Sequence, residues 1–543
     1  MSTSALALNG LLAVPLAFAV LAGLAARRTS DQLGLGLAVL GSFATLAWSV
    51  WVAVASGPSL GSLDLDVVWI AEMDVRWHLG ADGISVPLIL MTTLIAACCL
   101  LSLVRHAPAG GSRVSLAILL LVIETGVLGS FIALDMVLFF LFFEVALIPM
   151  WFVINAWGDA HDETGRHRAA TRFLIFTVLG SALMLVGFML VHSLTGTFDI
   201  VEIAATYRPS GPTAVAGAVL VALGLAVKTP LWPLHIWLPD AHSKAPTVGS
   251  VLLAAVLLKL GTYGFLRFWM PVTDPSWQLL APFVAALAVV GIIYAALACL
   301  AQTDLKRLIA YSSVGHMGFV VLAVATFTVG GVQAAVYASV AHGLITGLLF
   351  FVAGAIKDRY GTANLAHLRV LYGRVPRLAG VFAFAAMASL GLPGLAGFWG
   401  EMLAIRSAVD QAQVLPGGTF AVLAVIAAFG VILTTAYFLA LMRGMLQGPP
   451  SMVAAGLHGE APAGLQPRAS VARRPGPSTP AWATPLEPDS IEPGAPAVRI
   501  ADIGAWEWVA WSPLIALTLV FGVAPGLLLS PVSDAARAFF GGL

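Results

Sequence analysis

Long apolar runs recur along the whole chain and are separated by short polar stretches. A helix needs about 20 predominantly apolar residues to cross the hydrocarbon core of a bilayer. Roughly fourteen runs meet this requirement: 5–26, 33–55, 84–104, 114–133, 135–156, 170–193, 213–230, 247–269, 277–299, 306–326, 332–355, 376–411, 418–445 and 508–530. The pattern therefore predicts an all-α polytopic membrane protein with about 14 transmembrane helices.

Prolines interrupt two of these runs. Pro230, Pro233 and Pro239 follow Lys228 closely in LAVKTPLWPLHIWLPDAH, and Pro393 with Gly394 divides the long run 376–411. Proline removes a helix hydrogen bond, and in lipid the freed backbone groups are tolerated only inside protein or beside water. A simple packing kink is the alternative interpretation of each break.

The two interrupted runs are the seventh and the twelfth, five spans apart. An odd offset means that the repeated units point in opposite directions across the membrane, which is typical of transporters with inverted repeats and broken helices. We therefore expect two inverted five-helix repeats, each containing a broken helix. The predicted divisions are helices 1–3 (1–113), a first antiporter-like repeat (114–270), a second inverted repeat (271–446), a Pro/Ala/Gly-rich loop (447–505) and helix 14 (506–543).

Basic residues gather on alternate loops, which predicts the orientation of the chain. One side carries Arg27, Arg28, Arg105, Arg113, Arg166, Arg168, Arg172, Lys244, Lys306, Arg307, Lys357, Arg359, Arg369, Arg374, Arg377 and Arg443. The other side carries Arg76, Arg208, Arg267, Arg406 and Arg537. Cytoplasmic loops are enriched in Lys and Arg. We expect the first set to be cytoplasmic and both termini to lie on the outer side of the cell membrane.

Composition narrows the function classes. The chain is 59% hydrophobic and 10% charged, whereas soluble proteins carry about 25% charged residues. The net charge is zero, so nothing favours nucleic-acid binding. Cys98, Cys99 and Cys299 lie in apolar runs, and the sequence has no CxxC, strand-linked GxGxxG or P-loop motif. We expect no cofactor or metal site in this chain.

Ionisable residues nevertheless lie inside several apolar runs. They are Glu124, Glu144, Lys228, Lys259, His316, His342 and Glu401. A charge at the centre of a spanning helix costs about 2.5–3.5 kcal/mol and often marks an ion pathway. Burial shifts carboxyl and lysine groups by up to about 3–5 pKa units toward neutral pH, where they exchange protons readily. The row therefore predicts proton transfer.

Each member of the row also has a simpler interpretation. Glu144 and Lys228 would make a static buried ion pair, and Lys259 would extend its ammonium to the membrane surface. A lone histidine such as His316 or His342 is often a hydrogen-bonded core residue, and Glu124 would serve helix packing. An accidental row of this length is less plausible than an accident at any one position.

Five segments resemble one known family. They are HLGADGIS (78–85), FFEVALIPMWFVINAWG (142–158), KTPLWPLHIWLPDAHSKAPTVGSVLLAAVLLKLGTYGFLRF (228–268), DLKRLIAYSSVGHMGF (304–319) and LGLPGLAGFWGE (390–401). These segments are similar to the antiporter-like membrane subunits of proton-translocating NADH-quinone oxidoreductase, respiratory complex I. Within that family they most resemble the subunit M group, whose mitochondrial members are called chain 4. Residues 447–500 depart from the family pattern.

The resemblance implies a role for each buried group. Glu144 and Lys228 would be the pair at which protons enter, and Lys259 would be the central relay. His316 and His342 would carry protons onward to Glu401, the terminal residue that faces the exit. A glutamate at this last position indicates subunit M rather than subunit L or N. The resemblance further implies subunits L and N as neighbours in the membrane arm. FMN, iron–sulfur clusters and quinone would belong to partner subunits.

Three alternatives remain open at this point. Subunits of multisubunit Na⁺/H⁺ antiporters share the architecture and need neither NADH nor quinone. A membrane-bound hydrogenase subunit is the second alternative. The third, from a different class, is a structural anchor that conducts no ions.

Overall fold

The computed structural model describes residues 2–57, 63–106, 108–208, 210–273, 277–447 and 500–542. Within these ranges, twelve helices are long and apolar enough to cross a membrane, and the shorter apolar helices α8 (Pro212–Lys228) and α17 (Pro376–Ser389) join them. Every apolar run found in the sequence overlaps one of these helices, and the long run 376–411 also covers a further helix, Ala396–Val409. The all-α membrane fold is confirmed, while the Pro/Ala/Gly-rich loop lies almost entirely outside the described residues.

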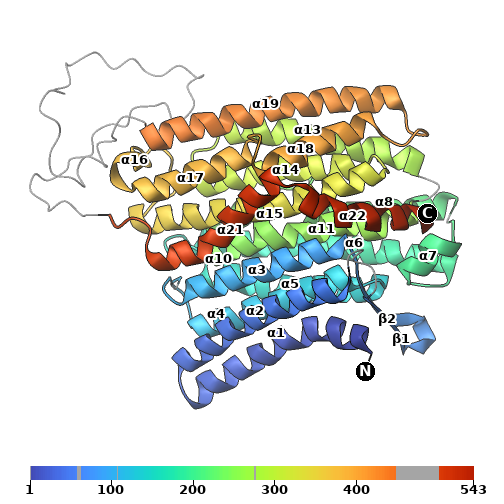
Figure 1. Cartoon of the computed structure of the whole chain (residues 1–543), viewed down its shortest axis with the longest axis horizontal. Coiled ribbons are helices and arrows are strands. Elements are labelled where there is room, and N and C mark those ends of the chain that lie inside the picture. Colours follow the sequence, from blue (N-terminus) through green and yellow to red (C-terminus); the bar gives the residue numbers. More distant parts are fainter. Residues whose placement is uncertain are drawn as a thin grey trace, which may run out of the picture.

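The N-terminal part consists of α1 (Thr3–Arg28), α2 (Asp31–Ala55) and α3 (Ser85–Leu103). An antiparallel hairpin, β1 (Leu63–Ile70) and β2 (Val75–Ala81), lies between α2 and α3, and η1 (Ala71–Met73) connects its strands. The hairpin, the start of α1 and the C-terminal helix α22 (Gly526–Gly542) lie at the same end of the bundle (Figure 1).

The middle part begins with α4 (Arg113–Ile132), α5 (Met136–Trp157), α6 (Glu163–Thr195), and α7 (Ile200–Thr206). Helix α8 ends at Lys228, and the chain becomes helical again in α9 (Trp237–Lys244). One continuous span then follows as α10 (Thr247–Leu252), η2 (Leu253–Leu257), α11 (Leu258–Gly264), η3 (Phe265–Trp269) and α12 (Met270–Val272). In η2 and η3 the helix widens to π-helical turns.

The last part contains α13 (Trp277–Leu300), α14 (Leu305–Val324), α15 (Val329–Tyr360), α16 (Leu371–Arg374) and α17. Helix α18 (Ala396–Val409), α19 (Gly417–Gln447) and α21 (Ala505–Val523) follow. Between α17 and α18, Gly391 and Gly394 adopt φ values of 83° and 91°, a region that favours glycine because other residues carry a Cβ. Both breaks predicted from proline are therefore present.

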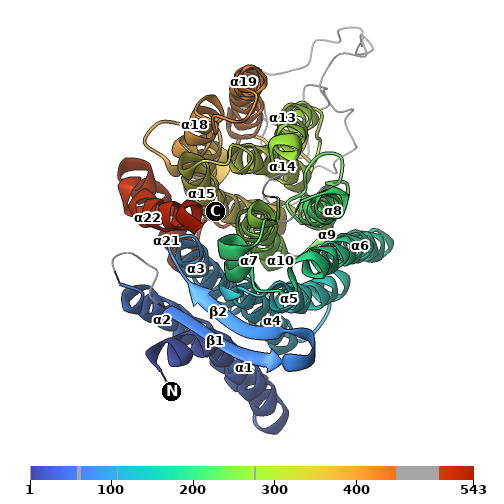
Figure 2. The ribbon, with the colours of Figure 1, turned by 90° about the vertical axis from the view of Figure 1, so that its right-hand side faces the viewer.

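The centre of the bundle is formed by the α10–α12 span and by α15. The spanning window of each is entirely buried inside the protein, whereas less than half of the window is buried in α1, α2, α6, α19 and α21. Viewed from the end, α10 and α15 lie in the middle, with α1 and α2 at one edge and α19 at the opposite edge (Figure 2). Side chains on the central helices are thus shielded from lipid.

Close contact between α6 and α8 holds the end of α8 in place. A Cβ added at Gly187 would lie 2.8 Å from the carbonyl oxygen of Gly217, and one at Gly224 would collide with the carbonyl oxygen of Gly180. Small residues let membrane helices approach to backbone distance, where van der Waals packing stabilises them. Gly224 is one turn before Lys228, so this contact also positions that lysine.

We expect Gly224→Ala to separate α6 from α8 and reduce the amount of assembled protein in the membrane by several fold, because the neighbouring atoms are backbone and cannot move aside. Quantification of the full-length chain in purified membranes checks this. Gly380→Ala is the matched control, since a Cβ there meets nothing within 4 Å. Equal amounts of the two variants would contradict the interpretation.

His78 ties the hairpin to the N-terminal ends of α5 and α7. Its Nδ1 lies 2.5 Å from Asp199 Oδ2 and its Nε2 lies 2.9 Å from Asp64 Oδ1. Asp199 also caps α7, and the N–H of Leu134 donates to the backbone carbonyl of His78. Burial lowers the pKa of His78, but the hydrogen bonds and charges of Asp199 and Asp64 outweigh it and raise the pKa to about 9. The imidazole is therefore protonated and joins two carboxylates at neutral pH.

These contacts of His78 predict that the stability of the hairpin depends on pH. Because the folded pKa of His78 lies above the unfolded value of about 6.5, its contribution is complete below pH 6.5 and is lost as pH rises through about 9. Hydrogen exchange of residues 63–81, corrected for the intrinsic rate, should show protection that falls between pH 7 and pH 10. In His78→Gln that fall should be absent; an identical pH profile in both proteins would contradict the assignment.

Candidate functional site: a row of buried ionisable side chains

The first pair in the row, Glu144 and Lys228, is close but not in direct contact. Lys228 is the last residue of α8, and its Nζ lies 4.5 Å from the centre of the Phe143 ring. Lys228 Nζ and Glu144 Oε1 are buried and have no hydrogen-bond partner among the described residues. The two side chains nevertheless interact electrostatically. A static, closed ion pair at this position is therefore wrong for this structure.

Lys259 occupies the centre of the bundle. It lies on α11, directly after the π-helical turn η2, and is fully buried. Its Nζ donates to the carbonyl oxygen of Ala254 at 2.7 Å and lies 2.6 Å from Nδ1 of His342 on α15. The interpretation that Lys259 extends to the membrane surface is thus wrong, because the ammonium points into the protein.

The row continues through two histidines to Glu401. The rings of His342 and His316 are 5.5 Å apart, centre to centre. His316 lies on α14, with Nε2 3.1 Å from Ser389 Oγ and Nδ1 3.2 Å from Glu401 Oε1. The contact with Glu401 is an ion-pair distance without hydrogen-bond geometry, since neither carboxylate oxygen has a hydrogen-bond partner among the described residues. Lys259, His342, His316 and Glu401 therefore lie in close succession.

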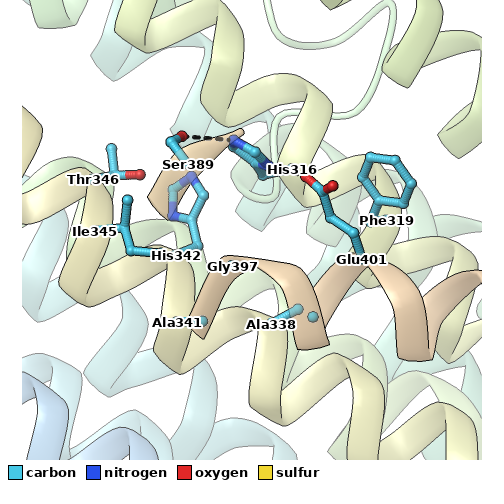
Figure 3. A pocket seen from close by; sticks show the side chains of 11 residues that line it. His316, Phe319, Ala338, Ala341, His342, Ile345, Thr346, Ser389, Gly397 and Glu401 are labelled. Carbon is cyan, nitrogen blue, oxygen red and sulfur yellow. Dashed lines mark hydrogen bonds and ion pairs between the residues drawn. The ribbon is translucent and has the colours of Figure 1, made fainter. Parts of the chain in front are cut away.

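A small cavity lies beside this stretch. It has a volume of about 30 Å³ and is lined by His316, His342, Thr346, Ser389 and Glu401. Figure 3 shows the His316 ring between Ser389 and Glu401, with His342 on the facing helix. A polar cavity of this volume holds at least one water. Ser389 ends α17 and Glu401 lies on α18, so the second helix break contributes both residues.

Glu124 lies apart from this connected row. It is on α4, which packs against α1, α3 and α5, and it is almost fully buried. Both carboxylate oxygens are without a hydrogen-bond partner among the described residues, and no contact joins Glu124 to Lys228 or Lys259 there. Its burial agrees with either a packing role or a protonation role.

Sequence reasoning missed three buried groups near the first break. His235 and His242 belong to the segment between Lys228 and Lys259 and are almost fully buried. Both ring nitrogens of His242 lack a hydrogen-bond partner among the described residues. Lys306, which the loop pattern assigns to an exposed cytoplasmic position, is 3% exposed. Both histidines lie beside the prolines in LWPLHIWLPDAH (231–242), but an isolated histidine carries little weight on its own.

The part of the chain that contains the two broken helices and the buried Lys259 also matches a known family. The family model described as NADH:quinone oxidoreductase/Mrp antiporter, transmembrane, matches residues 133–429, which contain every row residue except Glu124. The chain belongs to this family.

Relatives with known names agree with this membership. NADH-quinone oxidoreductase subunit M of Rhodobacter capsulatus is 37% identical over 85% of this chain and 81% of its own length. NADH-ubiquinone oxidoreductase chain 4 of Marchantia polymorpha is 32% identical, covering 81% of this chain and 86% of the relative.

Solved structures give the same fold. A chain of respiratory complex I from Thermus thermophilus with bound NADH superposes with a TM-score of 0.79 and 27% identity over the whole of both chains. A chain of the Mrp complex from Dietzia sp. DQ12-45-1b has a TM-score of 0.80 at 24% identity, covering 99% of this chain and 98% of that one, and this likeness concerns the fold alone.

Proposed function

We propose that this chain is a proton-translocating membrane-arm subunit of NADH-quinone oxidoreductase, of the subunit M type. The observation that carries the proposal is the close succession of Lys259, His342, His316 and Glu401 in the enclosed centre of the bundle. The names of the relatives contain NADH and quinone. In this proposal NADH oxidation and quinone reduction occur in other subunits, which hold FMN, iron–sulfur clusters and quinone. Subunits L and N are the proposed neighbours.

The proposed relay starts at the open pair. When Glu144 and Lys228 approach, each charge stabilises the other; when they separate, burial favours their neutral forms, so the pair takes up or releases a proton according to its separation. Lys259 receives the proton and passes it to Nδ1 of His342, which it already contacts. His316 and Glu401 then carry it toward the outer side.

Energy must come from outside the chain. Moving one charge against the membrane potential costs about 2.3 kcal/mol per 100 mV. Electron transfer in the partner subunits supplies it in this proposal. The basic end of the bundle, where α1 ends in Arg27 and Arg28 and α15 ends with Lys357 and Arg359, faces the cytoplasm by the positive-inside rule. Both termini then lie on the outer side of the cell membrane.

Glu144→Ala tests the input pair. We expect NADH-driven proton pumping by membrane vesicles to fall about tenfold or more while the complex assembles, because Lys228 loses the carboxylate that modulates its charge. Glu163→Ala, which removes an exposed glutamate on α6, is the control and should pump normally. Normal pumping by Glu144→Ala would favour the structural anchor instead.

Lys259→Arg tests whether the central site needs a proton that can leave. Arginine keeps the positive charge but does not deprotonate in proteins, and its larger fork does not fit the fully buried space between Ala254 and His342. Pumping should fall as far as in Lys259→Met. Lys244→Arg, at a half-exposed ion pair with Asp162, should retain pumping. If Lys259→Arg pumps like the unaltered chain, Lys259 serves only as a fixed charge.

A further inference from the structure

Arg267 lies on the central span, between Lys259 and the hairpin end of the bundle, where β1 and β2 lie (Figure 1). It belongs to the π-helical turn η3 and is only 8% exposed, although the pattern of basic residues placed it in a loop. Tyr263 lies midway, four residues from each. Residues four apart share a helix face, and eight residues extend about 12 Å along the axis. Arg267 therefore lies on the direct route from Lys259 to the hairpin end.

Asp82 fixes the position of the guanidinium. It follows β2 directly, and its Oδ2 accepts a hydrogen bond from Arg267 Nη2 at 2.5 Å. Its Oδ1 accepts from the backbone N–H groups of Ile84 and Ser85 at 3.0 and 3.1 Å, at the start of α3. Because one carboxylate oxygen binds the start of a helix and the other binds Arg267, the arginine is anchored to the segment between the hairpin and α3.

Aromatic rings enclose the span between these two basic residues. The ring centre of Tyr263 lies 5.2 Å from that of Phe131 on α4 and 6.4 Å from that of Phe139 on α5. Phe139 in turn lies 4.2 Å from Phe268 on η3, and the four rings, here called the aromatic collar, are fully buried. The Tyr263 hydroxyl donates to the carbonyl oxygen of Phe131 at 2.9 Å. Within 263–266, this hydroxyl is the only polar side-chain group that the span provides.

Arginine is unsuited to carrying a proton onward. A proton moves along a hydrogen-bonded chain only if every member can accept one bond and donate another. The guanidinium has five N–H donors and no acceptor, and it does not lose its proton in proteins. A fixed positive charge also excludes protons from a membrane pore. A chain that reached Arg267 through Tyr263 would end there, whereas Nδ1 of His342 lies 2.6 Å from Lys259 Nζ.

We propose that Arg267, anchored by Asp82 and surrounded by the aromatic collar, is a seal that closes the hairpin end of the central span to protons. The inference rests on the proposed function, in which Lys259 is the central relay and the hairpin end faces outward. With the direct route closed, a proton on Lys259 leaves through His342, and protons from the outer side do not flow back to Lys259. Arg267 therefore sets the route of the proton without carrying it.

Arg267→Gln tests the seal. Glutamine still donates to Asp82, but it loses the positive charge and adds a carbonyl oxygen that accepts a hydrogen bond. In proteoliposomes of the purified complex without NADH, a potassium diffusion potential should drive proton uptake about threefold or more faster than in the unaltered complex. NADH:quinone electron transfer, measured with a protonophore present, should stay unchanged. Arg406→Gln is the matched control, because Arg406 also pairs with an aspartate but its side chain is 72% exposed.

Tyr263→Phe, added to Arg267→Gln, separates a hydrogen-bonded leak from loosened packing. Phenylalanine keeps the ring in the aromatic collar and removes the hydroxyl that would link the glutamine to the region of Lys259. The double variant should return proton uptake to the unaltered rate. Arg267→His serves if glutamine prevents assembly. Beside Asp82 and Tyr263, an imidazolium has no acceptor but a neutral imidazole has one, so uptake should increase as pH rises.

The outcomes separate this inference from the proposed function, because passive uptake needs no NADH. Unaltered uptake by assembled Arg267→Gln means that the seal is wrong, and so does fast uptake that persists after Tyr263→Phe is added. If Lys259→Met stops pumping in either case, the relay still stands. If Lys259→Met pumps normally, the proposed function itself is wrong. Fast uptake in Arg267→Gln that the second substitution reverses, with Arg406→Gln unaffected, supports the seal.

Discussion

The absence of water in the bilayer core governs this structure. A backbone N–H or C=O exposed to hydrocarbon costs several kcal/mol, so a helix can be interrupted only where protein surrounds the interruption. At the interruption after Lys228 this condition is met by the chain itself, since Thr229, Pro230 and Leu231 are buried, whereas after Ser389 the residues Leu392, Pro393 and Gly394 are exposed on this chain. The ionisable side chains beside the two breaks, Lys228 and Glu401, are both buried. Backbone irregularity and buried charge therefore occur together.

Enclosure alone does not decide how each charge behaves. Lys228 has an aromatic face and a nearby carboxylate but no hydrogen bond, whereas Lys259 has a carbonyl oxygen and an imidazole nitrogen in direct contact. The first lysine is therefore sensitive to movements of its neighbour, and the second is held at a fixed distance from its acceptor. A pump needs both kinds of site, because one must respond to a distant event and the other must hand on a proton reliably.

The lengths of the apolar runs were sufficient to predict the spans, and the prolines were sufficient to predict both helix breaks, since these features depend on local composition. The contacts of Lys259 were beyond prediction, because they depend on the turn η2, whose residues LAAVL read as ordinary helix. His242 and Lys306 were missed for a related reason: burial of a single polar residue is set by helices distant in the sequence, here α14 and α15. The family resemblance implied roles for the buried residues, but only the structure showed that Glu144 and Lys228 are not in direct contact.

The π-helical turn before Lys259 affects how many residues the central span holds and in which direction Lys259 points. Each residue of an α-helix rotates the chain by about 100°, since 3.6 residues complete a turn. A π-turn accommodates one residue more than an α-turn does, and such turns occur mostly as single bulges. Loss of one residue from Leu253–Leu257 would therefore restore α-geometry there and leave Lys259 in nearly the same direction, because the π-turn had absorbed the extra residue. The π-turn thus lets the span hold one more residue without turning the ammonium away from His342 on α15.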